Sequence, residues 1–223
     1  MSGRDAILAR LKRSLGVAGD DTERRTITET RLAETPRGVI PKRGQLPLAE
    51  RIGMFVEQAE KVQASVARIG SYDELPAALQ TYLRDKNLPA ALRRGNDPRL
   101  AGVPWDKTPT LDVQTGPSDG HDAVGLSHSF AGIAETGTLV LQSGADNPTT
   151  LNFLPETHIV VVAAEDITGD METMWERLRA YNGKGTMPRT VNMITGPSRS
   201  GDIEQTILLG AHGPRALHIV VVG

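Results

Sequence analysis

Two short aliphatic runs constrain the fold of this chain more than any other feature. Residues 158–164 read His-Ile-Val-Val-Val-Ala-Ala, and residues 217–222 read Leu-His-Ile-Val-Val-Val. Both runs are apolar on the two faces that a β-strand presents, so a strand formed by either run must be covered from both sides. Strands of this kind lie at the centre of a parallel sheet that is flanked by helices.

Strand-like and helix-like segments alternate along the rest of the chain. This alternation predicts an α/β fold with a Rossmann-like, mainly parallel sheet flanked by helices. The strands that we expect lie at residues 62–66, 88–92, 110–114, 124–127, 137–142 and 190–195, and the helices at residues 48–59, 75–83 and 167–181.

The first 45 residues differ from residues 46–223, which we assign to the α/β domain. Residues 1–45 are polar and rich in charge, with one amphipathic helical segment between Ile7 and Leu15. Residues 20–44 hold scattered charges and two prolines, so we expect an extended arm there. Such an arm either wraps a partner subunit or forms a loose surface tail, and both alternatives stay open.

Composition argues against several classes of protein. The chain has 25 Lys and Arg against 27 Asp and Glu, and the resulting net charge of -2 argues against a nucleic-acid partner and against a polybasic membrane-surface protein. No apolar run approaches the ~20 residues that span a bilayer, so we expect a cytoplasmic protein without a membrane span. The chain has no cysteine, so it offers no thiolate ligand for zinc or an iron–sulfur cluster. Its five histidines lack metal-binding spacing, and we predict no metal site.

Ligands of open parallel sheets bind beyond the carboxyl ends of the strands, so we searched for chemistry directly after each run. The segment 196–204, Gly-Pro-Ser-Arg-Ser-Gly-Asp-Ile-Glu, follows the expected strand 190–195. Its serines and aspartate are good helix N-cap residues, so we expect a helix over residues 202–209. The segment matches neither the Walker A loop nor the Gly-x-Gly-x-x-Gly motif.

This segment supplies four of the predicted ligand-binding residues. Gly196 permits backbone angles that other residues avoid, and Ser198 and Asp202 carry short polar side chains. Together with the Arg199 guanidinium and the N–H groups of a helix start, they would form a cradle for a phosphate or a carboxylate. The alternative is a tight capped turn with a solvated arginine.

A second turn, residues 134–138, leads into the expected strand 137–142. It places the carboxylate of Glu135 next to the hydroxyls of Thr136 and Thr138 at a glycine corner. We predict that Glu135 is a general base and that Thr136, Gly137 and Thr138 bind the ligand. The alternative is that Glu135 pairs with an arginine while the threonines cap a turn.

Two weaker segments complete the search. His212 lies in a Gly-rich loop and can donate, accept or titrate near neutral pH, so we include it among the ligand-binding residues. A lone histidine in such a loop is more often a structural residue. The run 93–99, Arg-Arg-Gly-Asn-Asp-Pro-Arg, could meet an anionic substrate, although solvated loop charge is the simpler interpretation.

The segments 134–138 (Ala-Glu-Thr-Gly-Thr), 154–162 (Leu-Pro-Glu-Thr-His-Ile-Val-Val-Val), 196–204 and 209–218 (Leu-Gly-Ala-His-Gly-Pro-Arg-Ala-Leu-His) together resemble the lactate-utilisation protein C family, which is built on the LUD domain. The resemblance covers roughly residues 46–223. Ser200 and Gly201 stand where many relatives have Thr-Ala. The resemblance implies a fold similar to the sugar-phosphate isomerase and CoA-transferase group.

The resemblance also implies a function. Members of the family are linked to bacterial growth on L-lactate, alongside iron–sulfur partner proteins in a complex that oxidises lactate to pyruvate. We therefore expect a subunit that binds a small carboxylate or phosphate, carries no cofactor of its own, leaves the iron–sulfur clusters to its partners, and possesses a surface for a homo-oligomer. The alternatives are a stand-alone isomerase or transferase acting on a phosphorylated or CoA-linked small acid, and a non-catalytic interaction module.

Overall fold

The computed structural model describes residues 2–16, 21–203 and 206–223, and it divides into two compact units, Met1–Val39 and Ile40–Gly223. The first unit contains the helices α1 (Gly3–Leu15) and α2 (Thr22–Glu34), and neither helix has a buried residue. The prediction of an extended arm over residues 20–44 is therefore wrong for its first half. A helix forms there because the Asp21 side chain caps its N-terminus and because the two prolines, which would break a helix, lie beyond its end.

A six-stranded sheet forms the centre of the second unit, and every neighbouring pair of its strands is parallel. The two aliphatic runs form β12 and β7, which pair in register from Ala216 opposite Thr157 to Val222 opposite Ala163. The predicted α/β class is thus confirmed. In order across the sheet, the strands are β1 (Ser65–Ile69), β12 (Ala216–Val222), β7 (Thr157–Ala163), β4 (Val124–His128), β2 (Ala91–Arg94) and β3 (Asp112–Thr115).

Alternate residues of the central strands enter two different cores. Ile159 and Val161 of β7 pack with the leucines of α4 (Leu75–Asp85) on one face of the sheet. Val160 and Val162 pack with Phe55 and its neighbours in α3 (Leu48–Lys61) on the other face. This arrangement explains why both faces of the run had to be apolar.

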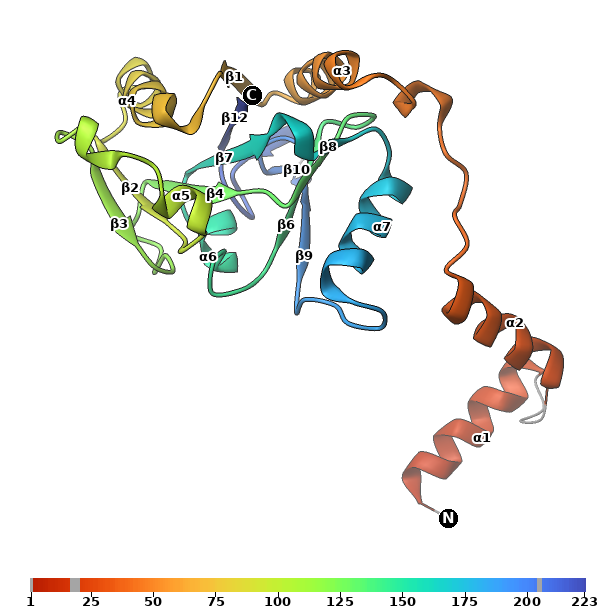
Figure 1. The fold of residues 1–223 in the computed structure, drawn as a ribbon. Coiled ribbons are helices and arrows are strands. Elements are labelled where there is room, and N and C mark those ends of the chain that lie inside the picture. Colours follow the sequence, from red (N-terminus) through yellow and green to blue (C-terminus); the bar gives the residue numbers. More distant parts are fainter. Residues whose placement is uncertain (1, 17–20, 204–205) are drawn as a thin grey trace. The chain divides into compact units, whose positions relative to one another are not determined.

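A second sheet, seen beside the central one in Figure 1, packs on the face that α3 also covers. The expected strands 137–142 and 190–195 exist but lie in this second sheet, as antiparallel neighbours, and not in the parallel one. The helix α7 (Met171–Asn182) covers the outer face of the second sheet through Met174 and Leu178. The four strands are β8 (Ile167–Thr168), β5 (Ala131–Ile133), β6 (Thr138–Gln142) and β9 (Val191–Ile194).

The segment predicted as a helix over residues 202–209 is instead part of an antiparallel hairpin, β10 (Arg199–Ile203) and β11 (Thr206–Leu209). The prediction relied on N-cap residues, but the segment also contains β-branched residues, which favour strands. The short helices are α5 (Pro98–Ala101) and α6 (Thr149–Phe153), with 3-10 turns at Lys42–Gly44, Tyr72–Glu74, Trp105–Lys107 and Ala164–Asp166.

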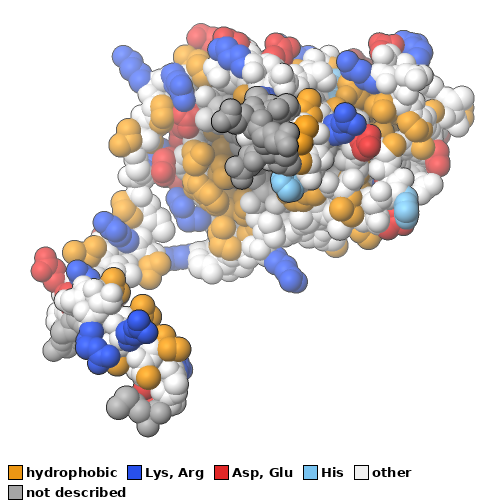
Figure 2. Space-filling model, turned by 180° about the vertical axis from the view of Figure 1, so that it is seen from behind, with side chains coloured by type: hydrophobic (Ala, Val, Ile, Leu, Met, Phe, Trp, Pro, Cys, Tyr) orange, Lys and Arg blue, Asp and Glu red, His pale blue; other side chains and the backbone are white. Residues whose placement is uncertain are grey.

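Surface charge is mixed over the larger body of the molecule. On the face that Figure 2 presents, acidic and basic side chains are interspersed with hydrophobic and neutral ones. Within the described parts of the chain, every helix is too short or too polar to cross a bilayer.

Candidate functional site

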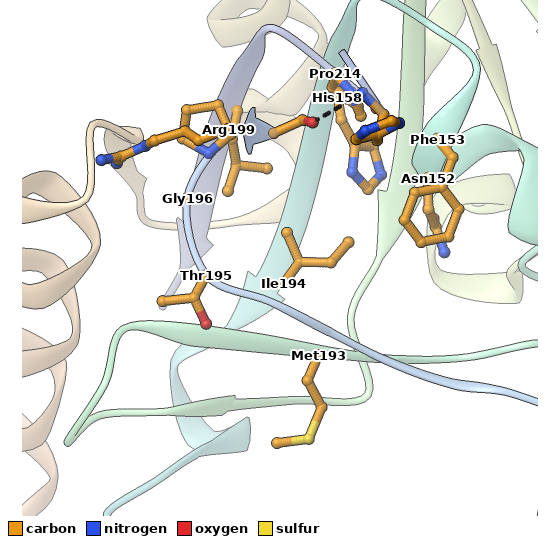
Figure 3. Close-up of a pocket in the computed structure, with 14 residues that line it drawn as sticks. Asn152, Phe153, His158, Met193, Ile194, Thr195, Gly196, Arg199 and Pro214 are labelled. Carbon is orange, nitrogen blue, oxygen red and sulfur yellow. Dashed lines mark hydrogen bonds between the residues drawn. The ribbon is translucent and has the colours of Figure 1, made fainter. Parts of the chain in front are cut away.

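Four of the predicted ligand-binding residues, Gly196, Ser198, Arg199 and His212, meet at one pocket of about 250 Å³. We call it the loop pocket, because the segment after β9 and the turn before β12 form much of its wall (Figure 3). It is lined by residues 193–199 and 212–214 together with Asn152, Phe153, His158 and Leu217.

Ser198 fixes the two loops against each other. Its backbone N–H donates to the carbonyl of Pro214 at 2.8 Å, and its carbonyl accepts from the N–H of Gly210 at 2.9 Å. Its Oγ also accepts a longer hydrogen bond, at 3.4 Å, from the backbone N–H of His212. The predicted residues Ser198 and His212 are therefore brought together by the turn itself.

The loop pocket lies at the amino ends of the central parallel strands. His158 is the second residue of β7, and Leu217 is the second residue of β12. We predicted a site at the carboxyl ends of the central strands, so the structure corrects its position. The cause is the second sheet, because β9 does not run within the parallel sheet and the segment after it reaches the opposite edge.

Glu135 does not line the loop pocket. Its side chain is 6% exposed, and its Oε1 accepts a hydrogen bond of 3.1 Å from the backbone N–H of Met171, the first residue of α7. Its second oxygen, Oε2, is buried without a partner among the described residues. A carboxylate at this place complements the positive end of a helix.

The turn that carries Glu135 nevertheless contacts the loop pocket. The hydroxyls of Thr136, Thr138 and Thr195 form a chain with two oxygen–oxygen distances of 2.7 Å, and Thr195 lines the pocket. Gly137, at φ +64°, lies so close to α3 that a Cβ would be 2.4 Å from the backbone nitrogen of Ala59. The two predicted turns are thus neighbours, although only one of them faces the pocket.

Arg199 is oriented away from the centre of the loop pocket, as Figure 3 shows. Its Nη2 donates to the carbonyl of Val62, the C-cap residue directly after α3. Gly196, at φ +77°, packs against the same residue, where a Cβ would lie 2.5 Å from the Val62 carbonyl oxygen. The side chain of Asp202 lies outside the described residues.

Sequence reasoning missed a buried polar cluster, two of whose three residues, Asn152 and His158, line the pocket. Ser127, Asn152 and His158 are each 1% exposed. The Ser127 hydroxyl donates to Asn152 Oδ1 at 3.0 Å and also lies 3.0 Å from His158 Nε2. Burial lowers the pKa of His158 to about 3, so its ring is neutral at physiological pH. The sequence did contain a sign of this cluster, since His158 is a polar residue at the start of an otherwise aliphatic run.

A second polar cluster follows the carboxyl ends of four parallel strands. Tyr72 follows β1, Asp97 and Arg99 follow β2, His128 ends β4, and Asp166 follows β7. Arg99 binds Asp97 through two hydrogen bonds of 3.0 and 2.7 Å, and its Nη1 lies 3.6 Å from Asp166. Although burial alone would raise the pKa of Asp97, the hydrogen bonds and charge of Arg99 lower it.

The histidine of this cluster is held neutral between two partners. His128 Nδ1 lies 2.8 Å from the carbonyl of Ser129, so it carries the proton, and Nε2 then accepts from Tyr72 Oη at 2.7 Å. Burial, together with the charge of Arg99, lowers the pKa of His128 to about 4. This carboxyl-edge cluster borders a cavity of about 430 Å³, but its charged groups already bind one another. The loop pocket is the better candidate for a ligand.

No group of three His, Asp or Glu side chains able to hold a metal ion occurs within residues 2–16, 21–203 and 206–223. Arg199 and His212, both predicted to bind the ligand, can supply hydrogen-bond donors to an anion at the loop pocket, and Arg199 also carries a permanent positive charge.

The chain is similar to several known proteins. A family model described as the LUD domain matches residues 52–222. Lactate utilization protein C from Geobacillus sp. (strain WCH70) is 41% identical over 100 residues, which cover 44% of this chain and 42% of that protein. The protein of the same name from Bacillus subtilis (strain 168) is 39% identical over 100 residues, with the same coverage of 44% and 42%. The matched part thus spans less than half the length of these relatives.

A solved structure supports the fold over a larger part of the chain. The crystal structure of a DUF162 family protein from Deinococcus radiodurans superposes with a TM-score of 0.59 at 27% sequence identity. The match covers 80% of this chain and 99% of that chain. The similarity therefore includes most of the α/β unit.

Proposed function

The chain belongs to the LUD domain family, and from this premise we propose that it is a component of a bacterial lactate-utilisation system. The observation that carries the proposal is its similarity, at 41% and 39% identity, to two proteins named Lactate utilization protein C. The loop pocket supports the proposal, because a volume of about 250 Å³ suits a ligand of a few heavy atoms.

The chain's part in such a system is to bind a small anion, while iron–sulfur partner proteins carry the electrons. The absence of cysteine supports this division, since the sequence offers no thiolate to hold a cluster. Among the described residues that line the loop pocket none is Asp or Glu, whereas Arg199 is one of them. The positive charge of Arg199 favours a carboxylate or phosphate over a cation.

Growth of the host on L-lactate as the sole carbon source tests the role. We expect a strain that lacks the gene to grow on glucose but to fail on L-lactate, and the wild-type gene to restore growth. Normal growth of the deletion strain on L-lactate would contradict the proposal.

Two arginine variants then test the pocket. Arg199→Ala should restore growth on L-lactate poorly, because it removes the permanent positive charge beside the loop pocket. Arg84→Ala, which removes an exposed arginine paired only with its neighbour Asp85 in the described contacts, should restore growth fully. Equal growth of both complemented strains would reject the pocket while leaving the lactate role intact.

The stand-alone isomerase or transferase stays an alternative. A transferase of that type needs the Glu135 carboxylate to meet an acyl group, whereas this side chain is buried and bound to α7. Turnover of an acyl-CoA by the purified single chain, with a covalent adduct on Glu135, would favour it. A pure interaction module would instead require residues 1–44 for co-purification with partners and tolerate substitution of Arg199.

A further inference from the structure

We propose that Asn152 and His158 recognise the ligand of the loop pocket and that this ligand is a small 2-hydroxy acid. The hydroxyl of the ligand donates to His158 Nδ1, and its carboxylate accepts from Asn152 Nδ2. The inference rests on the proposed function for the choice of lactate, whereas the roles of the two residues come from the hydrogen bonds of the pocket.

Ser127 fixes the proton position on the histidine. Its single hydroxyl hydrogen is donated to Asn152 Oδ1 at 3.0 Å, so its oxygen can only accept from His158 Nε2, also at 3.0 Å. Nε2 therefore carries the ring proton, and Nδ1 presents a lone pair. The structure places the amide oxygen of Asn152 toward Ser127, which leaves Nδ2 as the free donor.

Both remaining atoms are buried and unpaired. His158 Nδ1 and Asn152 Nδ2 have no hydrogen-bond partner among the described residues, although both side chains line the loop pocket. A buried polar atom without a partner costs about 1–3 kcal/mol, so two such atoms in one cavity are normally satisfied by water or by a bound ligand that replaces it. A ligand that satisfies both atoms needs one hydrogen-bond donor for His158 Nδ1 and one acceptor for Asn152 Nδ2.

A 2-hydroxy acid supplies this pair on adjacent carbon atoms. Its hydroxyl is a donor for Nδ1, and its carboxylate accepts from the amide. The pocket also offers apolar wall to a short aliphatic group, from Phe153, Ile194 and Leu217. A keto acid lacks the donor, because its carbonyl oxygen would face the lone pair of His158 Nδ1.

Three ligands distinguish these contacts on the unaltered full chain. Isothermal titration calorimetry at neutral pH should show L-lactate binding at least about tenfold more tightly than pyruvate or propionate, since one lost hydrogen bond to a buried acceptor accounts for a tenfold change. Pyruvate or propionate binding as tightly as L-lactate would overturn the proposal, and so would the absence of L-lactate binding. Growth of the deletion strain decides the lactate role separately.

Matched variants identify the two residues. Asn152→Asp keeps the shape and the acceptor for Ser127 but replaces the free donor by an oxygen, so we expect L-lactate affinity to fall at least about tenfold. His158→Gln keeps a donor toward Ser127 and loses the Nδ1 acceptor, so L-lactate should bind no better than propionate.

His218→Gln is the control for loss of a buried histidine. His218 lies on the neighbouring strand β12, bonds Ser65 through Nδ1 at 2.8 Å and does not line the loop pocket. Its substitution should leave L-lactate affinity unchanged. Circular dichroism verifies the fold of each variant. Wild-type affinity in folded Asn152→Asp, or retained discrimination in folded His158→Gln, would overturn the assignment.

Discussion

At the scale of single residues, the structure separates groups that complete the fold from groups that are free to bind. Glu135 and Arg199 were the two charged residues on which the sequence prediction relied. Each is bonded to backbone, Glu135 to Met171 and Arg199 to Val62. The unpaired polar atoms of the loop pocket belong instead to Asn152 and His158. The charged residues of the two turn motifs therefore indicated where the pocket lies, but they did not indicate which side chains are free to bind a ligand.

The contact between Glu135 and α7 predicts the effect of Glu135→Gln. The variant keeps an acceptor for the Met171 N–H but removes the negative charge at the positive end of the helix, so we expect unfolding free energy to fall by about 0.5–1 kcal/mol. Urea denaturation measures the change. Unchanged stability of Glu135→Gln would contradict a structural role for this contact.

The same variant decides the predicted role of Glu135 as a general base. A glutamine cannot accept a proton, so a base at this position predicts loss of growth on L-lactate in a folded protein. Growth of the Glu135→Gln strain at the wild-type rate would reject that role and leave the helix contact as the function of the residue.

At the scale of elements, helix α3 organises both turns around the loop pocket. Gly137 packs against the backbone of Ala59, Gly196 packs against Val62, and Arg199 bonds the Val62 carbonyl. The C-terminal end of one helix thus holds two loops that are far apart in sequence. Positive φ angles at both glycines make these close approaches possible.

Gly137→Ala should disrupt this packing. The left-handed backbone costs an alanine about 1–2 kcal/mol, and a Cβ 2.4 Å from the Ala59 nitrogen forces the helix and the turn apart, so we expect a loss of about 2–4 kcal/mol. Thermal and urea unfolding measure it. Gly53→Ala in α3, where a Cβ meets no neighbour within 4 Å, should instead stabilise by about 0.5–1 kcal/mol. Equal stabilities of the two variants would contradict the packing.

Hydrophobic pattern predicted the central elements, but not the second sheet. The runs that became β7 and β12 are apolar on both faces, and only a covered parallel sheet buries both faces at once. The strands β5 and β8 are short, three and two residues, and leave no recognisable period. Because the second sheet was missed, the loop after β9 was placed at the wrong end of the central strands. The position of the loop pocket depends on the pairing of β9 with β6, which the local sequence pattern does not reveal.

At the scale of the whole molecule, three histidines tie stability to pH. His128, His158 and His218 are buried in different parts of the α/β unit, and burial lowers the pKa of each, to about 4, about 3 and about 4 respectively. In the unfolded chain a histidine titrates near 6.5. Below that pH the unfolded state binds protons that the folded state does not, until the pH reaches the folded pKa.

Unfolding free energy should therefore be highest above pH ~6.5 and fall as the pH drops toward ~4. Each histidine contributes up to about 1.4 kcal/mol per pH unit in this interval. Urea denaturation at a series of pH values measures the slope, and His218→Gln should reduce it. Constant stability between neutral pH and about pH 5 would contradict the neutral, buried state of the three rings.

The order of strands in the central sheet has a consequence for synthesis on the ribosome. The strand β12 lies between β1 and β7, and among the described strands it is the last to be translated. Until it emerges from the exit tunnel, β1 has no neighbour in the sheet and one side of β7 is open. The nascent chain therefore carries an unpaired β1 for most of its elongation and, once residue 163 has been added, also an open edge on the aliphatic strand β7, a state in which chaperone binding protects against aggregation.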